Sequence, residues 1–252
     1  MLSVENLSIK FGGLVAVSNL NLTINNKEIV GLIGPNGAGK TTVFNMLTGV
    51  YSPTEGNICY LGENIEGLKP YVINEKKIAR TFQNIRLFKE MSILDNVKIS
   101  FNSKIKYNIF DIIFRSKKFK SEESIIEETS LKLLKAFNLD FKKDELAKNL
   151  SYGEQRKLEI VRALATSPSL LLLDEPAAGM NGNETLELME MIRWIKSEFN
   201  ISILLIEHDM NLVMGICERI IVLDYGKKIA EGTPKQIKNN KKVIEAYLGE
   251  GA

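Results

Sequence analysis

The stretch Gly34–Thr41 reads GPNGAGKT, and it fits the pattern G-x-x-x-x-G-K-S/T at every defined position. It follows the apolar run EIVGLI at 28–33 and precedes a segment with helical spacing from about Lys40 to Leu47. Glycines let the backbone turn tightly, so that several N–H groups face one anion, and the N-terminus of the next helix adds partial positive charge. The stretch therefore predicts a phosphate-binding loop between a strand and a helix.

Individual side chains of this loop have predicted roles. Lys40 can reach the β- and γ-phosphates of a nucleotide as a point charge, and the Thr41 hydroxyl can ligate Mg²⁺. The predicted nucleotide-binding residues here are Gly34, Pro35, Asn36, Gly37, Ala38, Gly39, Lys40, Thr41 and Thr42.

Two adjacent acids follow a second apolar run, LLLLDEP at 170–176. Continuous apolarity is typical of a central parallel strand, and ligands of such sheets bind beyond the carboxyl ends of the strands. We expect Asp174 to hold Mg²⁺, directly or through water, and Glu175 to polarise a water for attack on the γ-phosphate. The alternative is a helix-capping or turn pair. The phosphate loop upstream favours the catalytic interpretation.

The composition is that of an ordinary globular protein. The chain has 252 residues, a net charge of +2, 44% hydrophobic and 25% charged residues, which suits one large domain or one domain with an insertion. The charge does not demand nucleic acid as a partner. Cys59 and Cys217 match no metal-ligand spacing and are expected to be reduced thiols. No apolar run approaches the roughly 20 residues that span a bilayer.

The periodicity changes along the chain. Residues 1–30 show short β-type alternation, and helical and strand patterns alternate after about residue 151, which predicts a parallel sheet covered on both faces. Between them, residues 84–150 are mostly helical in period. There one buried helix face is predicted, formed by Ile125, Ile126, Leu131, Leu133, Leu134 and Phe137. The sequence thus predicts an α/β core interrupted by a helical insertion at roughly 84–160.

The segment LSYGEQRKLEIVRAL at 150–164 resembles the signature of ATP-binding cassette (ABC) ATPases, which reads L-S-G-G-Q. Leu150, Ser151 and Gly153 match this pattern, whereas Tyr152 and Glu154 depart from it. The resemblance implies that this segment closes over ATP held by the phosphate loop of a partner subunit. Whether the departures weaken that contact is left open by the sequence.

Other stretches resemble further motifs of the same family. Phe11 is placed like the aromatic residue that stacks on adenine, although a Phe near a strand end can also be a core residue. Gln83 resembles the Q-loop glutamine, which senses Mg²⁺ and water. His208, the chain's single histidine, resembles the switch histidine at the γ-phosphate. Asn181 stands where the family's D-loop usually ends in Asp.

The resemblance covers the whole chain and implies its organisation. Residues 1–252 would form a single ABC ATPase domain with a P-loop NTPase (RecA-like) parallel-sheet core and an N-terminal antiparallel β subdomain. The helical insertion at 84–160 would be its α-helical subdomain, and residues 232–252 a C-terminal helical extension. The implied cofactors are ATP and Mg²⁺.

The stretches ARTFQNIRLFKEMSILDNV, EHDMNLVMGICERI and VIEAYLGE resemble the longer ATPase subunit of branched-chain amino-acid importers. That resemblance implies ATP-driven uptake of Leu, Ile and Val through two integral-membrane permease subunits. It also implies a heterodimer with a second ABC ATPase subunit, an extracytoplasmic binding protein, and a peripheral position on the cytoplasmic face of the membrane.

Two other functions stay open. One is the ATPase of another transporter, such as a lipopolysaccharide-export type, and the other is a soluble ABC ATPase acting in DNA repair or translation. A basic cluster in the insertion has two interpretations as well, a contact with anionic lipid or a solvated charged face. It comprises Lys104, Lys106, Arg115, Lys117, Lys118 and Lys120.

Overall fold

The computed structural model describes residues 1–105 and 107–248. The chain forms two compact units, one of Met1–Gln83 with Ser169–Ala252 and the other of Asn84–Pro168. Among the described residues, no helix combines the length and the apolar character needed to cross a membrane.

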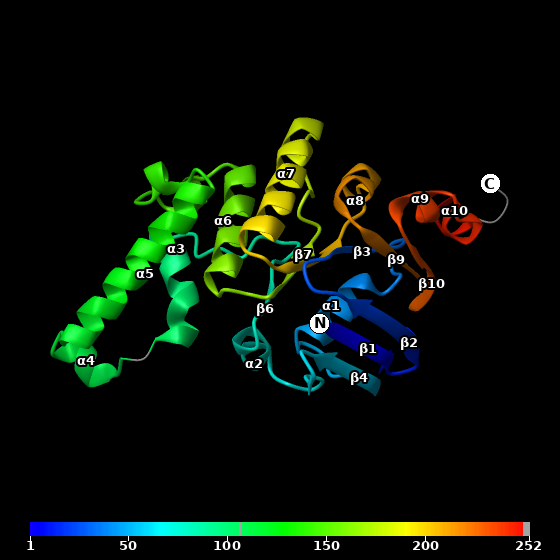
Figure 1. Cartoon of the computed structure of the whole chain (residues 1–252), viewed down its shortest axis with the longest axis horizontal. Helices are drawn as coiled ribbons and strands as arrows, with labels where there is room; N and C mark the ends of the chain where they lie inside the picture. The colour runs from blue at the N-terminus through cyan, green and yellow to red at the C-terminus, as the bar shows by residue number, and fades with distance from the viewer. Residues whose placement is uncertain (106, 249–252) are drawn as a thin grey trace. The chain divides into compact units, whose positions relative to one another are not determined.

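A six-stranded sheet is the centre of the first unit (Figure 1). Its order is β10-β9-β3-β8-β7-β6, with all neighbours parallel except β9 and β10. The strands are β3 (Ile29–Ile33), β6 (Ile78–Arg80), β7 (Leu170–Asp174), β8 (Ser202–Ile206), β9 (Arg219–Asp224) and β10 (Lys227–Gly232). Every residue of β3, β7 and β8 is buried, as expected for strands covered on both faces.

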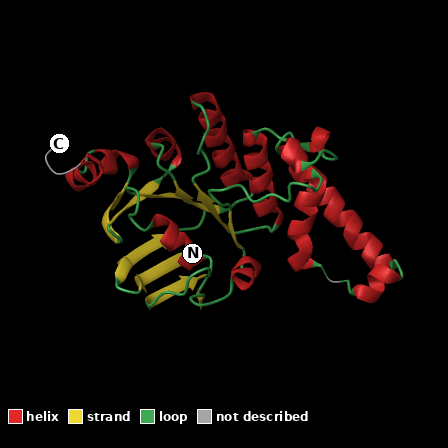
Figure 2. Ribbon diagram, turned by 180° about the vertical axis from the view of Figure 1, so that it is seen from behind, coloured by secondary structure: helices red, strands yellow, loops and turns green. Residues whose placement is uncertain are grey.

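A second sheet is antiparallel and has the order β2-β1-β4-β5. Its strands are β1 (Leu2–Phe11), β2 (Leu14–Ile24), β4 (Glu55–Tyr60) and β5 (Glu63–Asn64). Its apolar residues share one core cluster with α1 (Lys40–Leu47) and one face of the six-stranded sheet. Figure 2 shows the two sheets as separate layers. The predicted α/β class, with a parallel core and an antiparallel N-terminal sheet, is confirmed.

The remaining helices of the first unit complete its layers. They are α2 (Pro70–Glu75), α7 (Gly182–Glu198), α8 (Met210–Ile216), α9 (Pro234–Lys238) and α10 (Lys241–Leu248). Helices α7 and α8 cover the face of the large sheet opposite α1 (Figure 1). Helices α9 and α10 fall in the predicted C-terminal extension, of which residues 249–252 lie outside the described residues.

The second unit is helical. It contains α3 (Ile93–Lys98), α4 (Ile109–Ile113), α5 (Lys117–Ala136), α6 (Tyr152–Ala165) and the 3-10 turns Ile99–Lys104, Asp140–Lys142 and Ala147–Asn149. Helices α3, α5 and α6 pack against one another. Residue 160, the end of the expected insertion, falls inside α6.

The predicted buried face of α5 is confirmed in part. Ile126, Leu134 and Phe137 are buried, and Leu131 and Leu133 are partly buried. The prediction for Ile125 is wrong, because this residue is 59% exposed. Successive residues of a helix are about 100° apart, and Ile125 lies on the side of α5 that does not pack against other helices.

Candidate functional site

The loop after β3 needs glycine at specific positions. Gly34 has φ +152° and Gly39 has φ +99°. A Cβ at Gly34 would lie 2.0 Å from the carbonyl oxygen of Leu223, and one at Gly39 would lie 2.8 Å from the carbonyl oxygen of Ala16. Because both contacts are with backbone, no side-chain rotation relieves them. The loop therefore packs directly against the backbone at Leu223 and Ala16, and only glycine fits at Gly34 and Gly39.

Lys40 lies over this loop. Its Nζ donates to the carbonyl oxygens of Gly34, at 2.7 Å, and Pro35, at 2.9 Å, and the residue is 7% exposed. Burial lowers the pKa of Lys40, and the nearby carboxylates of Glu175 and Asp174 oppose that shift. The ammonium group is thus held at the loop and near both acids, where an anionic ligand would add compensating charge.

A cleft of about 460 Å³ opens on one side of the loop. Its lining is Phe11, Leu14, Val15, Ala16, Asn36, Gly37, Gly39, Lys40, Thr41, Thr42, Glu175 and Tyr225. Phe11 is 43% exposed and packs edge to face on Tyr51, with 5.1 Å between the ring centroids. Phe11 therefore lies at the cleft and not in the core.

The other side of the loop borders a second hollow, of about 610 Å³. It is lined by Pro35, Asn36, Gly37, Ala38, Asp224, Tyr225, Ile229, Lys242, Glu245 and Ala246. Between them, the two hollows account for all the predicted loop residues except Gly34, which Lys40 contacts directly.

Asp174 closes β7 and is 2% exposed. Its Oδ2 accepts from Nη2 of Arg80 at 2.7 Å, in an ion pair whose side chains are 3% and 7% exposed. The Arg80 guanidinium also donates to Asn45 Oδ1 at 2.7 Å and lies over the rings of Phe44 and Phe82. Asp174 is thus fixed from the neighbouring strand β6, by a residue that sequence reasoning missed.

Glu175 stands in a strained backbone conformation, with φ +46°. Its N–H donates to the carbonyl of Ile206 at 2.9 Å. Its Oε2 accepts from Nε2 of Gln83 at 2.8 Å and lies 3.8 Å from Nδ1 of His208. The structure therefore brings the three predicted catalytic residues together around one carboxylate oxygen.

Glu207 is a second residue that sequence reasoning missed. Its side chain is fully buried, and its carboxylate accepts the N–H groups of Ala177 at 2.7 Å, His208 at 2.9 Å and Asp209 at 3.2 Å. Burial raises the pKa of Glu207, although the three N–H bonds oppose the shift. The carboxylate ties the loop after β7 to the loop after β8, and so relates Glu175 to His208.

Weak sequence signals pointed to both missed residues. Arg80 is the last residue of β6, three positions before Gln83, and Glu207 is an acid directly after a buried strand. Each position places a charge at the carboxyl edge of a parallel sheet, which is where ligands of such sheets bind.

The predicted signature residues lie in the helical unit. Ser151 caps the N-terminus of α6, and Glu154 completes a capping box with it. Tyr152 is 46% exposed, its hydroxyl is 3.4 Å from Nη2 of Arg156, and a Cβ at Gly153 would meet open space. The segment is a well-capped helix start in which Ser151 and Tyr152 are exposed.

Asn181, the residue at the D-loop position, caps the N-terminus of α7. Its side chain accepts hydrogen bonds from the N–H groups of Asn183 and Glu184, and the Glu184 carboxylate accepts one from the Asn181 N–H. The substitution of Asp by Asn therefore leaves a complete helix cap.

The described residues contain no group of three or more His, Cys, Asp or Glu that could hold a metal ion by itself. Thr41, Gln83 and Asp174 supply a hydroxyl, an amide and a carboxylate. Mg²⁺ is usually bound by one or two protein oxygens together with water and substrate phosphates, so these residues fit a nucleotide-bound Mg²⁺.

Comparison with known proteins gives full-length matches. The family model for "ABC transporter" matches residues 17–178, and the model for "Branched-chain amino acid ATP-binding cassette transporter" matches residues 227–252. The chain is 48% identical over 250 residues to the high-affinity branched-chain amino acid transport ATP-binding protein LivG of Escherichia coli, covering 99% of this chain and 98% of the relative. It is 47% identical, with the same coverage, to BraF of Pseudomonas aeruginosa, which carries the same description.

Structural comparison agrees with these matches. The ADP conformation of MJ1267, an ATP-binding cassette of an ABC transporter, superposes with a TM-score of 0.85 at 30% sequence identity. The superposition covers 99% of both chains.

Proposed function

Because the chain belongs to the ABC transporter ATPase family, we propose that it binds and hydrolyses ATP to power an importer of branched-chain amino acids. The observation that carries the ATPase assignment is the cluster of Gln83, Glu175 and His208 beside the phosphate loop. The cargo rests on the full-length similarity to LivG and BraF and on the match of residues 227–252.

ATP would bind in the cleft beside the phosphate loop, with its adenine on Phe11. The Lys40 ammonium would then donate to phosphate oxygens in place of the loop carbonyls. Burial lowers the pKa of Lys40, and the negative charge of the phosphates would oppose that shift. When bound, Mg²⁺ neutralises charge on the β- and γ-phosphates. The sequence motifs predict Thr41 and Gln83 as its ligands. Because Asp174 Oδ2 is occupied by Arg80, we expect Asp174 to act through water.

Glu175 would accept a proton from the attacking water. Gln83 holds the carboxylate by one hydrogen bond, and the backbone bond to Ile206 fixes the strained turn that presents it. His208 extends a 64% exposed side chain from the next strand end, where it can contact the γ-phosphate. General-base assistance of this kind contributes roughly 10²–10⁴ in rate.

The partner of the ATP site would be a second ABC ATPase subunit. In such a heterodimer the Ser151 segment, with Tyr152, Gly153 and Glu154, closes over the ATP of the other subunit. Closure would be transmitted to two permease subunits that receive cargo from an extracytoplasmic binding protein. With these partners the chain would lie peripherally on the cytoplasmic face of the membrane, and the proposed function involves no nucleic acid.

Reconstitution tests this assignment. The chain should support uptake of labelled leucine when combined in vesicles with its permeases, a second ATPase subunit and the binding protein. Uptake should need ATP, and isoleucine and valine should compete with leucine. Export of lipopolysaccharide without uptake of leucine would favour the other transporter type. The lipopolysaccharide export protein LptB of Haemophilus influenzae, at 34% identity, represents that type. ATPase activity stimulated by DNA or ribosomes would support the soluble class.

A further inference from the structure

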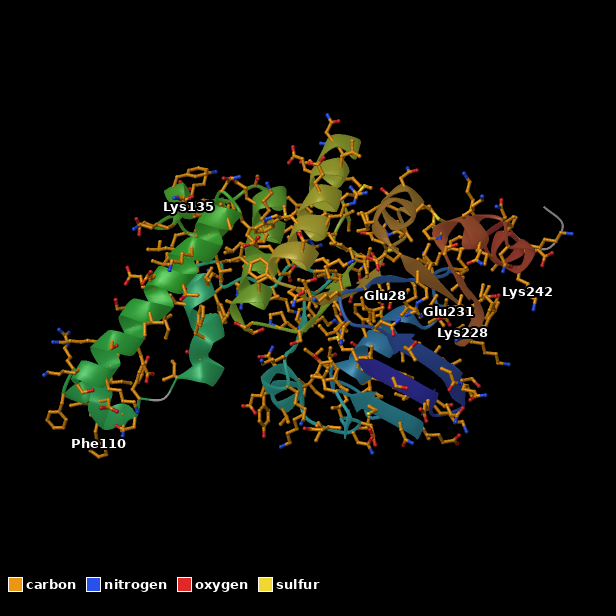
Figure 3. All side chains as sticks on the ribbon, in the orientation of Figure 1. Glu28, Phe110, Lys135, Lys228, Glu231 and Lys242 are labelled. Atoms are coloured by element: carbon orange, nitrogen blue, oxygen red, sulfur yellow. The ribbon has the colours of Figure 1, made fainter. Side chains whose placement is uncertain are left out.

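The helical unit carries an exposed apolar tip, defined here as residues 107–120. Helix α4 lies within it, and Figure 3 shows Phe110 at the end of this hairpin, away from the body of the unit. Five large apolar side chains in and just after α4 are exposed: Ile109 at 67%, Phe110 at 66%, Ile112 at 46%, Ile113 at 65% and Phe114 at 77%. No other short segment of the described chain exposes so many large apolar residues in a row.

The tip is held together by its own contacts. Asn108 and Asp111 form a capping box at the start of α4, and Ser116 donates to Asp111 at 2.7 Å. At the base, Tyr107 packs edge to face on Phe119 and donates to Glu123 at 2.7 Å. Polar and aromatic side chains thus build the turn, while the aliphatic and Phe side chains of α4 point outward.

Basic residues surround the apolar ones. Residues 104–120 contain six Lys or Arg and a single acid, Asp111, whose carboxylate is used inside the tip. Four of the basic residues, Arg115, Lys117, Lys118 and Lys120, are exposed. Lys106 lies outside the described residues, and the side chain of Lys104 is not described.

We propose that this tip docks onto an anionic lipid surface, with the α4 side chains at headgroup depth and the basic residues on lipid phosphates. At about 100° per residue, the four apolar residues of α4 cover one contiguous arc of about 160°, and Asp111 lies on the opposite side. This face is broader than the roughly 100° stripe of an ordinary surface helix. A protein groove buries a narrow stripe of a helix, whereas a lipid interface can receive a broad apolar face at the end of a protruding tip. Exposed Phe and Ile beside Lys and Arg are the composition that such interfaces bind.

Vesicle flotation of the full-length chain tests the proposal without nucleotide or cargo, so its result is separate from the transport assignment. The wild type should float with vesicles of phosphatidylcholine and phosphatidylglycerol, and remain unbound with phosphatidylcholine alone. The double variant F110S/I113S should bind the anionic vesicles about tenfold more weakly. Its matched control is I125S/F141S, which removes one Ile and one Phe of the same unit at 59% and 72% exposure.

Two charge-removing double variants measure the electrostatic contribution to vesicle binding. K117Q/K120Q should weaken binding and reduce its salt sensitivity, whereas K132Q/K135Q, farther along α5, should leave both unchanged. Unbound wild type on anionic vesicles, or equal losses in the tip and control variants, would overturn the proposal. So would a tip variant that floats like the wild type but fails to assemble with the permeases, because the tip would then be a protein contact. Circular dichroism melting confirms that each variant is folded.

Discussion

The ends of β7 and β8 are adjacent in the sheet and are built alike, with one difference. The buried acid Asp174 ends β7, and the buried acid Glu207 directly follows β8. Each acid is followed by a more exposed polar residue, Glu175 or His208. Asp174 is neutralised by a cation, Arg80, whereas Glu207 is held by backbone N–H groups. Burial raises the pKa of Glu207, and the hydrogen bonds from these N–H groups only partly oppose that shift. The buried charge of Asp174 is thus compensated by the cation Arg80, whereas burying the charge of Glu207 lowers the stability of its ionised form.

The largest effect is expected at Glu175, the residue after β7 that we propose accepts a proton from water. Replacing Glu175 by Gln keeps the size and the contact with Gln83 but removes the proton acceptor. ATP hydrolysis should fall by about 10²–10⁴ while ATP binding persists, measured by phosphate release and by retention of ATP on the closed dimer. Glu187→Gln, an exposed change on α7, is the control and should hydrolyse ATP normally. Normal turnover by E175Q would remove Glu175 from the mechanism.

The ion pair at β7 should carry more stability than any other contact of the two strand ends. Arg80→Met leaves the Asp174 carboxylate buried without its cation, and we expect a loss of about 3–5 kcal/mol in the free energy of unfolding in urea. The double variant R80M/D174N removes both charges and should be more stable than R80M alone.

An exposed pair provides the comparison. Lys10 and Glu55 are 3.5 Å apart with side chains 49% and 65% exposed, so Lys10→Met should cost about 0–1 kcal/mol. If R80M costs no more than K10M, Arg80 does not hold Asp174 in solution.

At β8 the corresponding change should cost less. In Glu207→Gln one oxygen can still accept from Ala177, but the new amide group faces the N–H groups of His208 and Asp209. Loss of these two bonds should cost about 1–3 kcal/mol in the free energy of unfolding. Hydrolysis should also fall, because the loops carrying Glu175 and His208 lose their link. Unchanged hydrolysis with lowered stability would make Glu207 a purely structural residue.

Site residues that lie close together in the sequence could be predicted, whereas contacts between residues far apart in the sequence could not. All groups of the phosphate loop lie within eight residues, so Lys40 and its glycines could be predicted from spacing. Arg80 and Asp174 are 94 positions apart, and Glu207 and Ala177 are 30 apart. Their contacts depend on β6, β7 and β8 being neighbours in that order, which spacing along the chain does not specify. The error at Ile125 was local, since apolar character alone does not fix a helix face.

The pH dependence should distinguish the two ways of burying an acid. Because burial raises the pKa of Glu207 above its ordinary 4.5, the folded chain binds this proton more tightly than the unfolded chain. The stability advantage of the wild type over E207Q should therefore be greatest below pH 4.5 and decrease as pH rises through the raised pKa. Urea unfolding of both proteins across that range measures it. An advantage that grows with pH would show that the three N–H bonds outweigh burial.

The smallest change in stability is expected at His208, although it sits on the same turn as Glu207. Its side chain is 64% exposed, and the nearest carboxylate oxygens, on Glu175 and Glu207, are 3.8 and 3.7 Å away, too far for a strong hydrogen bond. His208→Ala should therefore alter the free energy of unfolding by no more than about 0.5 kcal/mol, yet sharply reduce ATP-driven transport. Such a split identifies a side chain that contacts substrate. If transport survives, or stability falls as far as in E207Q, the histidine serves the fold. His208 would then have no role like the catalytic one that we propose for Glu175.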